Sequence, residues 1–136
     1  MRYGLKIVYP GWRVDSLRGE RIAFPARAPV VNAILTGTQF LVYVTGEGIV
    51  GAGEITGTVP DAVSRYGVGS GPFPVCLPMR LILELPVGDA VPLTSVGLRP
   101  FQLARQTWIP LTKKHFEHGL EEARERVDAL TPTLRT

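Results

Sequence analysis

The sequence predicts an α+β fold: a small, strongly bent β sheet with short helices and one C-terminal helix around it. Two apolar runs, Gln39 to Thr45 and Gly48 to Thr58, are joined by a Gly-Glu-Gly turn that supplies the positive φ angles of a tight hairpin. The second run contains Gly51 and Gly53, and glycines inside a strand are typical of bulges and sharp bends. The 15 glycines and 12 prolines among 136 residues indicate many short strands and turns rather than a helical bundle.

The segments before the hairpin predict a strand, a turn, a second strand and a short helix. Residues Tyr3 to Tyr9 alternate loosely between apolar and polar side chains and are ended by Pro10-Gly11. Arg21 to Phe24 begins a short strand that Pro25 interrupts, and Val30 to Leu35 is expected to form a short helix.

After the hairpin, residues 60–74 predict a long loop rich in glycine and proline. Phe73 to Leu85 is a further strand, which its prolines restrict to an edge or bulged position. A short helix is expected over Pro92 to Val96, and Phe101 to Ile109 is mixed. All of these elements belong to one expected domain, residues 1–136.

Residues Thr112 to Leu130 form the clearest predicted helix. Thr112 is a favourable N-cap, although His115 occupies the position where Glu or Gln would complete a capping box. One apolar stripe recurs at helical spacing and predicts packing against the sheet; it comprises Phe116, Leu120, Ala123, Val127 and Leu130.

Composition places the chain among globular proteins, with 45% hydrophobic and 20% charged residues. The single Cys76 has no partner for an internal disulfide and is expected to be a buried, inert thiol. We see no signal peptide and no apolar run of the roughly 20 residues that a membrane span needs. A cytoplasmic protein is therefore expected.

The net charge of +3 is unevenly distributed. Residues 1–111 contain 10 basic and 7 acidic residues, whereas residues 112–130 contain 4 and 5. The positive excess on the β-rich part favours a polyanionic partner. A charge of this size is equally ordinary for a soluble domain, so the interpretation stays open.

Established catalytic and metal-binding motifs are not recognisable. His115 and His118 are three residues apart on the predicted helix, but no cysteine or acidic cluster accompanies them. Neither a nucleophile elbow nor a phosphate loop occurs, and the Gly-x-Gly pairs precede no helix of the kind that a dinucleotide site requires. We therefore predict no catalytic residue, no metal and no cofactor.

The hairpin, together with Leu17-Arg-Gly-Glu-Arg-Ile-Ala-Phe24 before it, resembles the core of EVE domains. These belong to the PUA-like superfamily, which also includes YTH and ASCH domains. The resemblance implies a PUA-like β-pseudobarrel of five to six strands with short helices and one C-terminal helix. One position departs from the family pattern: Gly4 stands where many members have tryptophan, which leaves a base-binding cage open or transfers that role to Trp12.

The resemblance also implies a function, namely non-catalytic binding of RNA or DNA through a modified or flipped-out base. Nucleobase pockets need flat aromatic faces and a few polar groups. The turn Tyr9-Pro-Gly-Trp12, the strand Leu41 to Thr45 and the segment Arg105 to Thr112 match family patterns. The expected base pocket comprises Tyr9, Trp12, Tyr43, Thr45, Thr107 and Trp108, with Arg13 and Arg105 holding phosphates.

Other interpretations remain open from the residues. Lys6, Thr45 and Glu54 could form the Lys-Thr-Glu set by which small ASCH-type amidohydrolases act on acylated nucleosides. Glu54 could equally face solvent in a structural ion pair, and Trp12 and Trp108 could be core aromatics. The exposed face of the last helix could instead bind a protein. The residues do not predict an oligomeric state.

Overall fold

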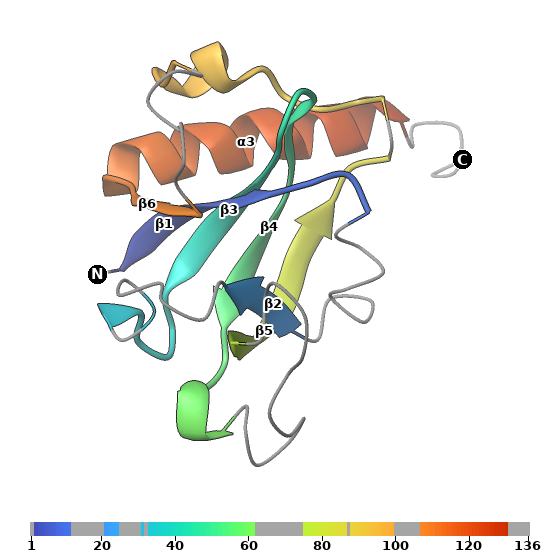
Figure 1. Cartoon of the computed structure of the whole chain (residues 1–136). Helices are drawn as coiled ribbons and strands as arrows, with labels where there is room; N and C mark the ends of the chain where they lie inside the picture. The colour runs from blue at the N-terminus through green and yellow to red at the C-terminus, as the bar shows by residue number, and fades with distance from the viewer. Residues whose placement is uncertain are drawn as a thin grey trace.

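In the computed structural model, six strands form one mixed sheet in the order β2-β5-β4-β3-β1-β6 (Figure 1). The structure describes residues 2–11, 21–24, 31, 33–61, 75–86, 88–99 and 107–130. The strands are β1 (Tyr3–Val8), β2 (Arg21–Phe24), β3 (Gln39–Val44), β4 (Gly48–Ile55), β5 (Val75–Glu84) and β6 (Trp108–Pro110). The 3₁₀ helix η2 (Leu93–Val96) and the α-helix α3 (Lys113–Leu130) complete the described elements.

The predicted hairpin is confirmed. Strands β3 and β4 pair antiparallel, from Gln39 opposite Glu54 to Val44 opposite Gly48. The turn has positive φ at Gly46 (82°) and Gly48 (132°), values that side chains disfavour. Strand β1 runs parallel to β3 along its whole length, which places the ends of both strands at the same end of the sheet.

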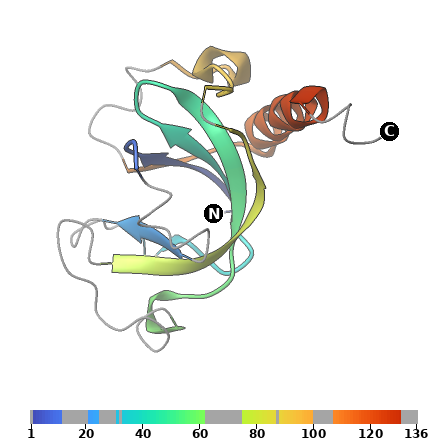
Figure 2. The ribbon, with the colours of Figure 1, turned by 90° about the vertical axis from the view of Figure 1, so that its right-hand side faces the viewer.

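The sheet bends sharply into a half-barrel (Figure 2). Strands β2 and β6 are its two opposite edges, yet the rings of Phe24 on β2 and Trp108 on β6 have centroids 6.1 Å apart. Side chains of the two edges therefore meet across the concave side. The predicted bent sheet with a C-terminal helix is confirmed.

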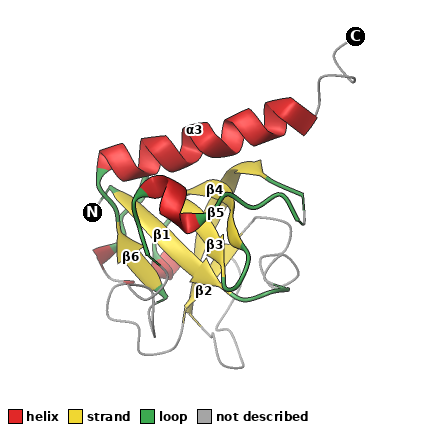
Figure 3. Cartoon of the chain, turned by 90° about the horizontal axis from the view of Figure 1, so that it is seen from above, coloured by secondary structure: helices red, strands yellow, loops and turns green. Residues whose placement is uncertain are grey.

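Each face of the sheet covers its own apolar core. The concave core includes Phe24, Phe40, Val42, Val44, Leu77 and Trp108. The convex core includes Leu5, Leu41, Tyr43, Leu93, Val96 and Phe116, and it is covered by α3 and η2 (Figure 3). Since alternate residues of one strand enter different cores, β3 is buried on both faces.

Helix α3 matches the predicted helix, and Thr112 caps it as expected, because its Oγ1 accepts a hydrogen bond from the backbone N–H of His115 (3.1 Å). The helix approaches the sheet closely at Gly119. A Cβ atom at that position would overlap Cδ1 of Leu41 and lie 2.9 Å from Cγ1 of Val96.

The prolines of β5 predicted either an edge strand or a bulged strand. Strand β5 is bulged, and it is not an edge strand. It lies between β2 and β4, and its register with β4 shifts at Ala52/Gly53. Pro78 is tolerated because it pairs with Arg21, the first residue of β2, at the end of that ladder. Cys76 is buried as predicted. The expected loop over 60–74 lies largely outside the described residues. Of the short helix expected over 30–35, residues 31 and 33 have a 3₁₀ conformation, whereas 34 and 35 belong to no helix.

Candidate functional site

Lys6 is buried in the concave core, with 2% of its surface exposed. Its Nζ donates a hydrogen bond to the carbonyl oxygen of Ile7 (3.1 Å) and lies 4.6 Å from the centroid of the Phe24 ring. Among the described residues, no carboxylate forms an ion pair with it. Burial removes water from the ammonium group and lowers the pKa of Lys6 to about 7. Lys6 can therefore lose its proton near neutral pH.

The alternation of β1 explains this position. Leu5 packs in the convex core, so the neighbouring Gly4 and Lys6 face the concave side. Lys6 is also the register partner of Trp108 on β6. The sequence suggested Lys6 only as part of a catalytic set. Its burial had one signal in the sequence: Lys6 follows Gly4 by two residues, so both lie on the same face of the strand.

The indole of Trp108 fills the space beside Gly4. A Cβ atom on Gly4 would overlap Cζ2 and Cε2 of that ring. Trp108 is 3% exposed and also packs against Phe40, with ring centroids 5.7 Å apart. The space left by the missing side chain at position 4 is thus occupied by Trp108. The sequence left open either an open cage or a role for Trp12, and Trp12 lies outside the described residues.

Tyr9 and Thr45 come together where β1 and β3 end. The backbone N–H of Thr45 donates to the carbonyl oxygen of Val8 (2.9 Å), and the Thr45 Oγ1 donates to the same oxygen (3.2 Å). Tyr9 follows Val8 directly and is 43% exposed. We call Tyr9 and Thr45 the rim of the half-barrel.

The other predicted pocket residues that the structure describes do not all lie on one face of the sheet. Tyr43 packs in the convex core beneath α3 and η2, so it lies on the opposite face of the sheet from Trp108. Thr107 is half-buried, and its carbonyl oxygen accepts a hydrogen bond from the N–H of Ile7 (2.9 Å). Arg13 and Arg105 lie outside the described residues, as Trp12 does.

Glu54 lies on the convex side, where its Oε2 forms an ion pair with Nη2 of Arg80 (2.9 Å). This is the structural pairing that the sequence left open. Lys6 faces the concave side and Thr45 lies at the rim. The three residues of the suggested amidohydrolase set are therefore not assembled.

The described residues contain no group of three or more His, Cys, Asp or Glu side chains placed to hold a metal ion. His118 Nε2 lies 3.5 Å from Oε1 of Glu122, one turn along the helix. In the part of the chain that is described, no helix has the length and apolar character to cross a membrane.

No family model matches the chain, and no curated protein matches it. Solved structures do. A protein of Leishmania major has a TM-score of 0.62 with 13% identity, covering 93% of this chain and 97% of its own. A protein of Rhodopseudomonas palustris has a TM-score of 0.59 with 21% identity, covering 92% and 94%. A mutant of the ASCH protein of Zymomonas mobilis has a TM-score of 0.51 with 13% identity, covering 85% and 94%.

The chain has an ASCH-type, PUA-like fold. Its bent sheet and C-terminal helix match these structures over most of their length. At such low identity the likeness shows the fold alone, because one fold hosts many functions. The finer resemblance to EVE domains stays a prediction. Function therefore has to be argued from the residues of this chain.

Proposed function

We propose that the protein binds nucleic acid without catalysing a reaction, and that an unstacked, modified or flipped-out base lies at the rim of the half-barrel. The observation that carries this proposal is the exposed Tyr9, which directly follows Val8, the residue to which Thr45 is hydrogen-bonded. Base recognition in single strands needs an aromatic face for stacking and polar groups for the base edge. Tyr9 supplies the first. The hydroxyl oxygen of Thr45 supplies the second as an acceptor, because its O–H and N–H already donate to Val8.

The charge distribution supports a polyanionic partner on the barrel rather than on the helix. The positive excess lies in residues 1–111, while residues 112–130 contain more acidic than basic residues. Phosphates are attracted to the positive surface of residues 1–111 and repelled by the more acidic residues 112–130. Arg13 and Arg105 remain our candidates for phosphate contacts.

An amine-based hydrolase is the second candidate, because the lowered pKa of Lys6 suits a general base or a nucleophile near neutral pH. The position of Glu54 on the opposite face, paired with Arg80, argues against the Lys-Thr-Glu set. We therefore favour binding, and the experiment below includes a test for turnover.

The test is a binding screen with short single-stranded RNA and DNA of the same sequence, and with free modified nucleosides. Stacking on one aromatic ring contributes about 1–3 kcal/mol per base. Tyr9→Ala should then weaken binding roughly 5- to 150-fold, since about 1.4 kcal/mol is a factor of ten. Leu35→Ala is the matched control, because Leu35 is 59% exposed and precedes the start of β3, at the other end of the sheet.

Unchanged affinity in Tyr9→Ala, or no oligonucleotide or nucleoside that binds the wild type, would refute the proposal. The thermal midpoint of each variant shows whether it is folded. Incubated nucleosides are also analysed by chromatography. A hydrolysed product that disappears in Lys6→Met would assign the protein to the hydrolase class instead.

A further inference from the structure

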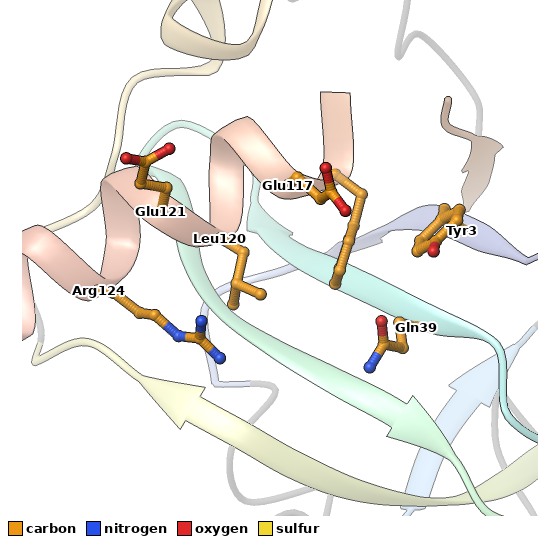
Figure 4. A pocket seen from close by; sticks show the side chains of 7 residues that line it. Tyr3, Gln39, Glu117, Leu120, Glu121 and Arg124 are labelled. Carbon is orange, nitrogen blue, oxygen red and sulfur yellow. The ribbon is translucent and has the colours of Figure 1, made fainter. Parts of the chain in front are cut away.

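A groove of about 390 Å³ lies on the convex side, between α3 and the start of β1 and β3 (Figure 4). This volume is within the range of roughly 300–1,000 Å³ that is typical of ligand sites. Tyr3 and Gln39 line the groove from the sheet. The helix contributes Phe116, Glu117, Leu120, Glu121 and Arg124. The sequence predicted that Phe116 and Leu120 pack against the sheet, and it left open that the exposed face of this helix binds a protein.

The register of the sheet and the period of the helix create the groove. Tyr3 and Gln39 are direct neighbours on the parallel strands β1 and β3. Glu117, Leu120 and Arg124 follow one another at spacings of three and four, so they share one face of α3. The Tyr3 ring packs against Phe116 with centroids 5.0 Å apart, which holds the aromatic wall in place.

The two ends of the groove carry opposite charges. Glu117 extends toward Tyr3, whereas Arg124 lies at the far end with Leu120 between them (Figure 4). Seven residues of α-helix separate the two charged positions by about 10 Å along the axis. Glu117 also lies 3.8 Å from Lys113, but both side chains are exposed, at 60% and 69%. Such a surface pair contributes little, so a better partner can replace Lys113.

We propose that this groove binds an extended segment of a partner protein by an arginine side chain. The guanidinium stacks on Tyr3, donates to the Glu117 carboxylate and reaches the amide oxygen of Gln39. Arginine suits this site because its planar group both stacks and pairs with a carboxylate. An acidic residue of the same segment pairs with Arg124. In a polyproline II conformation, three residues rise about 9 Å and return side chains i and i+3 to the same face, which matches the separation of the two charges.

The occupant is a peptide rather than nucleic acid because of the charge around the groove. Glu117 and Glu121 both line it, and residues 112–130 contain 5 acidic against 4 basic residues. A polyanion would be repelled there. The groove lies at the start of β1 and β3, whereas the rim lies at their ends, so this inference does not depend on the proposed function.

The experiment is an NMR titration of the ¹⁵N-labelled protein with the peptide acetyl-Arg-Ala-Ala-Glu-amide. We expect saturating shifts at the backbone amides of Gln39 and Leu120, with a dissociation constant in the millimolar range that is typical of a few contacts. The control peptide has citrulline in place of arginine. It keeps the shape but lacks the positive charge, and it should bind several-fold more weakly.

Two variants and one control test the residues. Glu117→Gln and Arg124→Gln should each weaken binding several-fold and leave the thermal midpoint unchanged. Glu125→Gln makes the same charge change as Glu117→Gln at an exposed position of α3 outside the groove and should bind as the wild type does. Absence of saturating shifts, equal binding of the citrulline peptide, or equal weakening by Glu125→Gln would overturn the proposal. So would RNA binding that is lost in Arg124→Gln.

Discussion

Replacing Lys6 by methionine tests whether the amine in the concave core is a neutral group near physiological pH. Methionine keeps the length and apolar stem of lysine but has no charge to desolvate. Burial lowers the pKa of Lys6 from 10.5 to about 7. In the unfolded chain the side chain regains its usual pKa, so between pH 7 and 10.5 the unfolded state binds more protons than the folded state.

The sign follows from this difference. Because the unfolded state binds more protons, the free energy of unfolding of the wild type rises with pH across that window. Below pH 7 both states are protonated and the full penalty for burying the charge remains. At about 1.36 kcal/mol per pH unit, the change from pH 7 to pH 10 is at most about 4 kcal/mol. The Phe24 ring and the Ile7 carbonyl attract the ammonium and reduce this value.

The assay is urea unfolding of the wild type and Lys6→Met at several pH values from 6 to 10. We expect the stability advantage of the methionine variant to be largest at pH 6 and to shrink by a few kcal/mol by pH 10. Lys113→Met is the control, because the Lys113 side chain is 69% exposed and should show no such trend. A constant difference between wild type and Lys6→Met across the range would refute the reasoning.

Two glycine substitutions test the packing on the two faces. Gly4→Ala forces the Trp108 indole to move and should destabilise the fold by about 1–3 kcal/mol in urea unfolding. In a Trp108→Val background the same substitution should cost less. An equal cost in both backgrounds would contradict the contact between Gly4 and Trp108. Gly119→Ala would raise stability by about 1 kcal/mol in an exposed helix, but here the added methyl group overlaps a leucine of β3. We therefore expect Gly119→Ala to lower the thermal midpoint. The control Glu125→Ala should not lower it. A raised midpoint in Gly119→Ala would contradict the close approach of the helix to the sheet.

Local patterns in the sequence predicted most of the elements. The Gly-Glu-Gly turn between two apolar runs predicted the hairpin, and Thr112 with the apolar stripe predicted α3. These signals act over a few residues, through turn geometry, capping and the helical period. The parallel pairing of β1 with β3 was not predicted, because residues 9–38 separate the two strands and no short pattern encodes their contact.

The candidate site was harder to predict for a different reason. Alternation along a strand assigns residues to two sets, but it indicates which set faces the core only when the other set is polar. In β3 the five residues Phe40 to Val44 are apolar and buried, and they belong to both sets. The sequence therefore could not place Tyr43 and Trp108 on opposite faces of the sheet, and it grouped them in one pocket.

The sequence by itself determined the turns, the strand and helix periods, the cap at Thr112 and the uneven charge, because each depends on neighbouring residues. Only the tertiary structure decided that Lys6 is buried, that Trp108 fills the space beside Gly4 and that Tyr3 meets α3 in a groove. These outcomes depend on how far the sheet curls and on where the helix crosses it. Both are set by the packing of side chains from distant strands, which no local pattern contains.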